Sequence, residues 1–435
     1  MEGQIRVFAQ EQSAALGAQM TPKLITVCED ETFHPAVCLV AIEPVSGFIL
    51  LETYAQKRDE ETWTAALKSA LGDMPVRVIQ STSDEGKGLL AHVSKGLGAH
   101  HSPDVFHIQH ELCRAVSAGL AAQVRRAEEL VSKAQAEAEA QRQQAQMWPL
   151  VPHGPGRPPD FAGRVAAAQA TVGQAEQSLE ATRQRQERAH RAVRGVAKVY
   201  HPVELDTSAP RSAAQAVTEL EQHFTQLQAV AHEASLPERC HKGIEKAHRL
   251  VPAMSGTLAF FHQQVRVRID ELGLPTEEAR IVELVLVPAA YLERAAKRAR
   301  PADARVVLHE QAARLRTAPD VVAGLAALRP EQRTAVESVV ADCADLFQRA
   351  SSCVEGRNGQ LSLRHHGLHT ITPTRLEALT AVHNYFLRRS DGTTAAQRFF
   401  GAPHADLFNF LLDHLDMPAR PAAKRSQQKV APLPN

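Results

Sequence analysis

A heptad repeat near the middle of this 435-residue chain constrains its fold more than any other feature. Mostly apolar residues recur there at alternating steps of three and four: Val165, Ala168, Val172, Ala175, Leu179, Thr182, Gln186, Ala189, Val193 and Val196. This spacing places the side chains along one side of an α-helix, which must pack against another helix to exclude water. The repeat therefore predicts a long helix that belongs to a coiled coil.

The segment just upstream supplies a partner for this helix. VRRAEELVSKAQAEAEAQRQQAQ has the Ala-rich and charged composition of a long helix, and the Pro- and Gly-rich PLVPHGPGRPPDF separates the two. Because such a break favours a turn, we expect an antiparallel coiled-coil hairpin over residues 111–200. The same apolar seam is also compatible with a homodimer, which stays open as an alternative.

The helical pattern continues from residue 201 to residue 345 as amphipathic segments. Prolines separate them: Pro202, Pro210, Pro237, Pro275, Pro301 and Pro330. Several histidines fall in this stretch, but they form neither an HExxH motif nor a Cys/His quartet, so we expect packing or surface roles. We therefore expect an all-α insertion over 111–345, made of the hairpin and a helical bundle.

The segment before the insertion, residues 1–110, has a mixed α/β pattern. LITVC, AVCLVAIEP and FILLETYA read as three strands in hairpin order, and DEETWTAALKSAL reads as a helix. VRVIQST reads as a fourth strand and DVFHIQH as a fifth, so the sequence predicts a mixed sheet.

Two carboxylates stand at strand ends in this segment, Asp30 after the first strand and Asp84 after the fourth. If these two strands are neighbours, the carboxylates approach each other, which is unfavourable unless a cation joins them. Carboxylate oxygens suit Mg²⁺ or Mn²⁺. Taken singly, each acid is more readily interpreted as an ordinary loop acid. Successive strand residues face opposite sides, so only one of Glu29 and Asp30 can face such a site.

The third segment, residues 346–418, begins with an acidic residue and continues as a basic stretch. Glu355 stands at the start of an expected helix, and Arg364, Arg388 and Arg389 follow it. Tyr385, Phe386, Phe399 and Phe400 are interleaved with them, a combination that suits phosphate binding or base stacking. The aromatic side chains also occur at helical spacing, so packing in the core is the competing interpretation.

Both end segments resemble DDE-type transposases of bacterial insertion sequences. VEGRNGQLSLRHHGLH and RLEALTAVHNYFLRRSDGTTAAQRFFG resemble their C-terminal signature, in which a helix carries the last catalytic Glu. CEDETFHPAVCLVAIEPVSGFIL and STSDEGKGLL resemble the strands that carry the two Asp residues. The resemblance implies an RNase H-like α/β mixed-sheet core, interrupted by the all-α insertion, with Asp30, Asp84 and Glu355 as catalytic and metal-binding residues.

The activity implied by this resemblance is cleavage and transfer of DNA strands at transposon ends. Asp30 would bridge two Mg²⁺ or Mn²⁺ ions, and Asp84 and Glu355 would each hold one. Asn358 would orient Glu355 or contact DNA. The cations and polar groups expected to bind DNA are His34, Lys87, Arg357, Asn358, Arg364, Arg388 and Arg389.

Two further interpretations remain beside a working transposase. Transposases of this type generally carry an N-terminal helix-turn-helix region, whereas only 29 residues precede Asp30. The chain could therefore be a non-catalytic remnant that binds DNA or a transposase. An RNase H-like nuclease would share the metal site.

Bulk properties limit the remaining classes. Lys plus Arg and Asp plus Glu are equal at 49 each, so net charge gives no argument for DNA binding. The six scattered cysteines form no CxxC pair and are expected to be buried thiols. EGKG lacks the P-loop spacing, and no small-molecule cofactor is expected. Without a secretory signal or a membrane-length apolar run, we expect a cytoplasmic protein with a disordered tail over 419–435.

Overall fold

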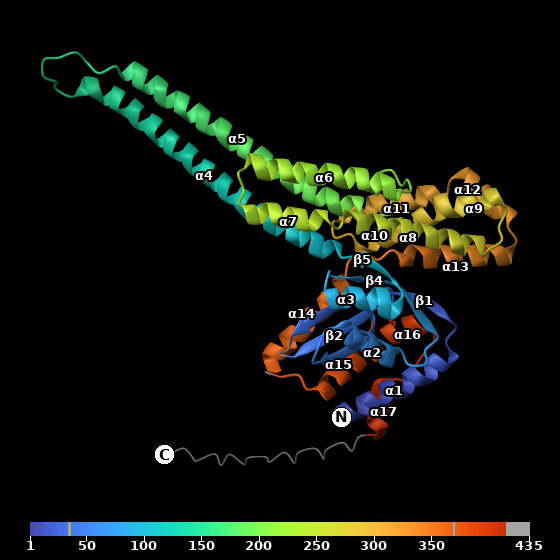
Figure 1. Ribbon diagram of the computed structural model, residues 1–435. Helices are drawn as coiled ribbons and strands as arrows, with labels where there is room; N and C mark the ends of the chain where they lie inside the picture. Colours follow the sequence, from blue (N-terminus) through green and yellow to red (C-terminus); the bar gives the residue numbers. More distant parts are fainter. Residues whose placement is uncertain (34–35, 369, 415–435) are drawn as a thin grey trace, which may run out of the picture.

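The predicted mixed sheet and large helical region are both present and form two bodies (Figure 1). The structure, a computed structural model, describes residues 1–33, 36–368 and 370–414. Both ends of the described chain contribute to the sheet body, and the middle forms the helical region with its long arm (Figure 1). His34 and the expected disorder of residues 419–435 lie outside the described residues.

The sheet has five strands in the order β3-β2-β1-β4-β5. Their bounds are β1 Lys23–Phe33, β2 Val37–Glu43, β3 Phe48–Ala55, β4 Val76–Ser83 and β5 His100–Pro103. β1, β2 and β3 pair antiparallel, whereas β4 runs parallel to both β1 and β5. The first and fourth strands are thus neighbours, which brings the ends that carry Asp30 and Asp84 together.

The predicted fifth strand, DVFHIQH, is wrong, because these residues begin a helix. β5 is instead the preceding segment HHSP, and α4 (Val105–Met147) starts directly after Asp104. Asp104 caps this helix by accepting a hydrogen bond from the Phe106 N–H at 2.7 Å. Val105, Ile108 and Leu112 are all buried, which is the three- and four-residue spacing of a helix face.

Helices cover both faces of the sheet and its β3 edge. On one face, Trp63 and Leu67 of α2 (Glu60–Leu71) pack with Leu89 of α3 (Lys87–Ala91), which continues into the π-helical turn η1 (His92–Leu97). On the other face, α14 (Ser352–Leu368) packs on β1 and β2.

At the edge, Asn384 of α15 (Pro373–Tyr385) bonds both backbone groups of Ile49 in β3, at 2.9 and 3.0 Å. This pairing satisfies an otherwise open strand edge. Three more helices complete the body: α1 Glu2–Gln19, α16 Ala395–Phe400 and α17 Leu407–His414.

α4 and α5 (Phe161–Val199) run antiparallel as a hairpin that projects from the molecule (Figure 1). The heptad residues of the outer half of α5, such as Val165 and Val172, are half-buried, whereas Ala189 and Val196 are fully buried. The difference arises because the inner half of the hairpin also packs against the bundle. That bundle comprises α6 Ala213–Glu233, α7 Glu238–His248, α8 Val251–Asp270, α9 Thr276–Ile281, η3 Val282–Leu286, α10 Val287–Arg298, α11 Ala302–Arg316, α12 Pro319–Ala327 and α13 Pro330–Leu346.

The two bodies are joined where the chain enters and leaves the helical region. The buried carboxylate of Asp104, at the entry, accepts hydrogen bonds from the N–H (3.2 Å) and hydroxyl of Ser351, at the exit. The carbonyl of Gln348 accepts from Gln80 and Thr82 of β4, at 2.9 and 3.1 Å. The start of α14 is therefore fixed against the ends of β4 and β5.

The apolar length of the helices and the state of the cysteines were both predicted from the sequence. In the described ranges, none of the helices is long and apolar enough to cross a membrane. The cysteines are free thiols, and Cys28, Cys38, Cys240 and Cys343 are buried as expected. Cys353 is half-buried, and Cys113 is exposed on α4, contrary to expectation, because it lies beside the α4 face that packs into the bundle.

Candidate active site

Asp30 lies near the end of β1 and faces α14, whereas its neighbours face the opposite side of the sheet. Glu29 is buried and bonds Ser81 and His92, with 3.2 Å between its Oε1 and His92 Nε2. Glu31 accepts from Trp63 Nε1 at 3.1 Å and pairs with Arg58 at 2.9 Å. Of the three consecutive acids, Asp30 is thus the one on the α14 face, as the resemblance implied.

Asp84 directly follows β4 and shapes the turn into α3. Its Oδ1 accepts the Gly86 N–H at 2.9 Å, a local bond that fixes the turn. The side chain is half-buried, and the carboxylate raises the pKa of the adjacent Glu85, an effect second to that of burial. Asp84 is therefore fixed at the end of β4, the strand next to β1.

Glu355 lies in the first turn of α14, where its backbone N–H donates to the Ser351 carbonyl at 3.1 Å. Val354 and Leu361 of α14 pack on Cys28, Val40 and Ile42 of the sheet. The Glu355 side chain is 34% exposed, so its carboxylate is open to solvent while the helix beneath it is anchored.

Two side chains of the next turn fix α14 on the sheet. Asn358 donates from Nδ2 to Asp30 Oδ2 at 2.9 Å, so it orients Asp30 rather than Glu355. Arg357 makes a bidentate ion pair with Glu52 of β3, at 2.7 and 2.6 Å, and is only 5% exposed. A guanidinium buried in this way does not reach DNA, so Arg357 is removed from the DNA-binding candidates.

Two of the predicted carboxylates affect the third, Asp30. Burial, followed by the nearby charges of Glu355 and Asp84, raises the pKa of Asp30 to about 7. The Glu31 backbone and His107 oppose part of this rise. Carboxylates so placed favour uptake of a proton or a cation. The structure therefore places Asp84, after β4, and Glu355, in α14, near enough to Asp30 of β1 to affect its pKa.

A divalent ion would suit the oxygen donors gathered here. However, nowhere in the described parts of the chain do three or more His, Cys, Asp or Glu side chains lie close enough together to hold a metal ion. Asn358 holds one oxygen of Asp30, and Glu355 is turned toward His107. Metal binding would therefore need a rotation of the Glu355 side chain, which its partial exposure leaves free to occur.

His107 belongs to this site, and the sequence analysis missed it. Its Nε2 lies 3.3 Å from Glu355 Oε1 and 3.8 Å from Asp104 Oδ2. His107 lies in DVFHIQH, which was interpreted as a strand, so it was not assigned to the site. The spacing of Val105, Ile108 and Leu112 is the signal that would have placed it on the first turn of a helix.

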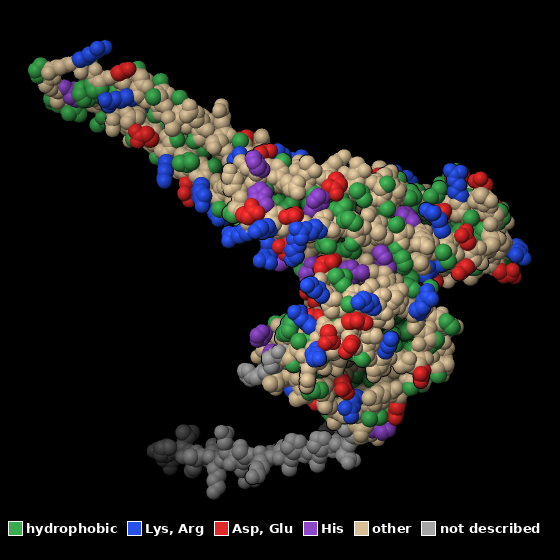
Figure 2. All heavy atoms as spheres, viewed as in Figure 1, with side chains coloured by type: hydrophobic (Ala, Val, Ile, Leu, Met, Phe, Trp, Pro, Cys, Tyr) green, Lys and Arg blue, Asp and Glu red, His purple; other side chains and the backbone are tan. Residues whose placement is uncertain are grey.

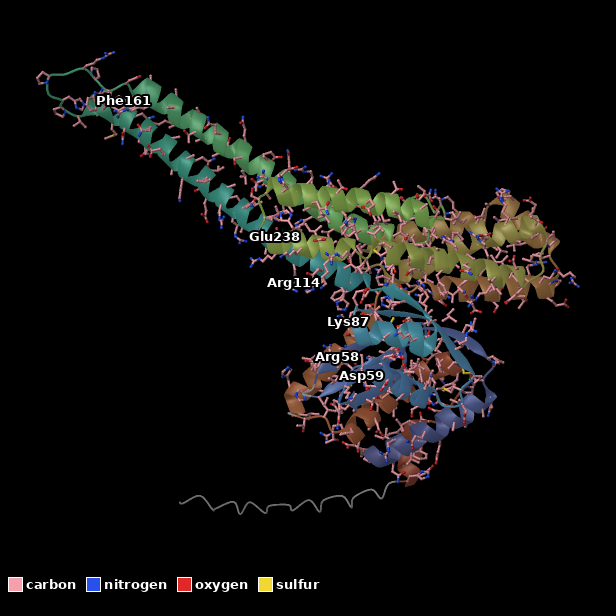
Figure 3. The ribbon with its side chains drawn as sticks, in the orientation of Figure 1. Arg58, Asp59, Lys87, Arg114, Phe161 and Glu238 are labelled. Atoms are coloured by element: carbon pink, nitrogen blue, oxygen red, sulfur yellow. The ribbon has the colours of Figure 1, made fainter. Side chains whose placement is uncertain are left out.

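The remaining cations predicted to bind DNA fall into two groups. Lys87 is exposed at the start of α3, near Arg58 and Asp59 (Figure 3), and Arg364 is exposed on α14. Arg388 and Arg389 lie after α15, where Arg389 bonds the Val45 carbonyl at 3.3 Å. Val45 follows the end of β2, five residues beyond Val40, which is the β2 partner of Asp30, so Arg389 does not adjoin the carboxylates.

The aromatic residues of the same segment are mostly core. Tyr385, Phe399 and Phe400 are buried, and the Phe399 ring stacks on Phe48 with 4.6 Å between centroids. Phe386 alone of the four is exposed, at 47%. The packing interpretation therefore holds for three of them.

Comparison with known proteins finds a similarity in the C-terminal third. Residues 282–427 match the model of a protein family described as a family of unknown function (DUF6399). The matched span contains Glu355 and Asn358 but neither Asp30 nor Asp84. The comparisons with curated proteins and with solved structures gave no match. Over residues 282–427, then, the chain is similar to a family whose function is unknown.

Proposed function

We propose that this chain is the catalytic core of a DDE-type DNA transposase with an RNase H-like sheet. Its substrate is DNA, and Asp30, Asp84 and Glu355 are its metal-binding residues. The observation that carries the proposal is the convergence of three acids from distant segments: Glu355 and Asp84 both raise the pKa of Asp30, and Asn358 bonds it. The parallel pairing of β1 and β4 supports it.

The proposed chemistry is phosphoryl transfer. When bound, two Mg²⁺ or Mn²⁺ ions supply activation of a water or 3′-hydroxyl nucleophile and stabilisation of the leaving oxygen. Asp30, Asp84 and Glu355 would hold the ions, and Asn358 holds the orientation of the Asp30 carboxylate. The buried Arg357–Glu52 pair keeps α14 in register with the sheet.

Nicking of supercoiled plasmid DNA in the presence of Mn²⁺ or Mg²⁺ tests the proposal. Asp30→Asn, Asp84→Asn and Glu355→Gln should each lower the nicking rate by about 10³-fold, because several kcal/mol of transition-state stabilisation is lost. Asp73→Asn is the matched control, since this exposed acid precedes β4, at the opposite end of that strand from Asp84. Full activity in any one of the three variants would remove that residue from the site.

A second candidate is a non-catalytic protein that binds DNA or a transposase. One observation favours this candidate: among the described residues, the carboxylates do not lie close enough together to hold a metal ion as they stand. Calorimetric titration with Mn²⁺ separates the two: binding that is lost in Asp30→Asn supports catalysis, and no binding favours this alternative.

An RNase H-like nuclease would share the metal dependence of a transposase. Its products differ, because a nuclease releases nicked DNA and does not join a 3′-hydroxyl end to a second duplex. Strand-joining assays with a pre-nicked substrate therefore distinguish it from a transposase core.

A further inference from the structure

One side of α4 leads from the candidate active site to the exposed cation Arg114. His107, Glu111 and Arg114 follow one another at steps of four and three, so they share one side of the helix. His107 contacts Glu355, which places Arg114 about two turns, or roughly 10 Å, further along the helix axis. In Figure 3, Arg114, Lys87 and Arg58 follow one another from the helical region to the sheet body.

α7 adds further cations to this side of α4, because the two helices pack directly against each other. Lys246 of α7 pairs with Glu111 at 3.3 Å, and a Cβ at Gly243 would stand 3.2 Å from the Ala115 Cβ. α7 also carries Arg239 and Lys242, both exposed. Figure 2 shows the Lys and Arg side chains gathered over α7 and the adjoining part of α4, on the side toward the sheet body.

The cations of this surface differ from the more numerous ones on α5. On α5, Arg183 pairs with Glu128 at 2.8 Å, Arg188 pairs with Glu233, and Lys198 pairs with Asp206. Among the described residues, no acidic side chain pairs with Arg114, Arg239 or Lys242. The charge of Lys242 contributes to lowering the pKa of Glu245 on the same helix, after the larger effect of Arg249, but none of the three cations is held in a close ion pair. Each can therefore turn toward a polyanion.

We propose that Arg114, Arg239 and Lys242 bind the phosphate backbone of double-stranded DNA and lead it to the acidic site. The inference rests on the proposed function and specifies where the duplex lies. Two packed helices present these charges on a rigid surface, and Lys87 continues it across the site. Contacts between these cations and phosphates position the duplex but do not read its base sequence.

The spacing suits a duplex. The distance from His107 to Arg114 corresponds to about three base pairs at roughly 3.4 Å per step. The Arg114 side chain is therefore placed to contact a phosphate a few nucleotides from the phosphodiester that would be cleaved near Glu355. The negative charge of Glu111, which lies between them, is paired with Lys246 and does not oppose the DNA.

Fluorescence anisotropy of the full chain with a labelled 30-base-pair duplex tests this placement between 50 and 200 mM NaCl. The variant Arg114→Gln/Arg239→Gln/Lys242→Gln should bind at least about tenfold more weakly. Its dependence of log K on log [NaCl] should be shallower by up to about 2.7, since each lost phosphate contact removes about 0.9. Lys297→Gln/Arg305→Gln/Arg314→Gln is the matched control on α10 and α11, with the same change in charge at exposed, unpaired residues.

The outcomes separate this inference from the proposed function. Unchanged affinity and salt slope in the first variant would overturn the inference, even if nicking depends on Asp30. A weaker first variant with an unaffected control supports it, even if the wild-type chain nicks no DNA. Stronger binding of single-stranded DNA or of RNA than of the duplex would also overturn it. Asp30→Asn/Glu355→Gln should bind the duplex at least as well as wild type.

Discussion

At the residue scale, Asp30 is where charges from the two ends of the chain meet. Its folded-state pKa of about 7 lies well above the value of roughly 3.9 expected in an unfolded chain. Between these two values the folded protein holds a proton that the unfolded chain has lost. Stability therefore falls as the pH rises toward 7, and the carboxylate destabilises the metal-free protein above it.

The first prediction is that Asp30→Asn stabilises the metal-free protein at pH 8 and has little effect at pH 4. The gain should be about 2 kcal/mol, less than the full shift implies because the site is partly open to solvent. Urea unfolding at the two pH values measures it. Asp73→Asn, an exposed acid of the same body, is the control. A variant no more stable than wild type at pH 8 would contradict the strained environment of Asp30.

A metal ion should reverse this difference. Mn²⁺ neutralises the carboxylates, so it should raise the unfolding temperature of the wild-type chain more than that of Asp30→Asn. Thermal unfolding at pH 8 with and without Mn²⁺ gives the comparison. Equal shifts in both proteins would mean that the ion binds elsewhere.

The positions of Asp30 and Asp84 near strand ends and of Glu355 at a helix start could be predicted from sequence, whereas their catalytic role stays a prediction. The roles of Arg357 and Asn358 could not be predicted. Successive side chains on a helix point in directions about 100° apart, so Arg357 and Asn358 reach different partners. An error of one residue in placing the helix on the sheet would exchange those partners. Arg357 reaches Glu52 and Asn358 reaches Asp30, partners more than 300 residues away, for which no local pattern exists.

At the scale of elements, a buried ion pair ties α14 to β3. The Glu52 carboxylate accepts hydrogen bonds from two Arg357 nitrogens and, at 2.5 Å, from the Thr380 hydroxyl of α15. One carboxylate thus ties two helices to the sheet. Because neither partner is open to water, removing one leaves the other charged and buried.

Arg357→Met should therefore cost about 3–5 kcal/mol of folding stability, since it leaves Glu52 ionised and unpaired. Glu52→Gln/Arg357→Met removes both charges and should recover most of that loss. Urea unfolding of wild type, both single variants and the double variant completes the cycle. A loss below about 1 kcal/mol in Arg357→Met would show that the pair does not anchor α14.

The elements themselves were predicted to different degrees. β1 to β4 follow from their β-branched and alternating residues, and the hairpin follows from the heptad repeat. DVFHIQH was misassigned because a short apolar run fits strand and helix alike, and the capping role of Asp104 decides between them.

At the scale of the whole molecule, the sheet body and the helical region meet at one junction, and the long arm formed by α4 and α5 projects from the helical region. The arm is in regular antiparallel register, with Gln135 bonded to Glu176 at 3.3 Å and Arg142 to Gln169 at 2.9 Å. The heptad repeat predicts such a coiled-coil arm. The junction between Asp104 and Ser351 could not be predicted, because 247 positions separate the two residues.

Replacing residues 132–179 with a short Gly/Ser linker tests what the arm contributes. The cut preserves the register given by the Arg183–Glu128 pair and leaves Arg114 and α7 in place. The outer arm packs only on itself, so the unfolding temperature of the remainder should change by no more than a few degrees. The affinity for duplex DNA should also be retained.

The same deletion decides between a hairpin and a dimerising coiled coil. The seam of α5 is already covered by α4 of the same chain, so sedimentation should give the same oligomeric state before and after the deletion. Leu130 and Met147 are more than half exposed on the arm, and Leu130→Glu/Met147→Glu in the intact chain is a milder version of the test. A dimer that becomes a monomer in either protein would show that the arm joins two copies of this chain.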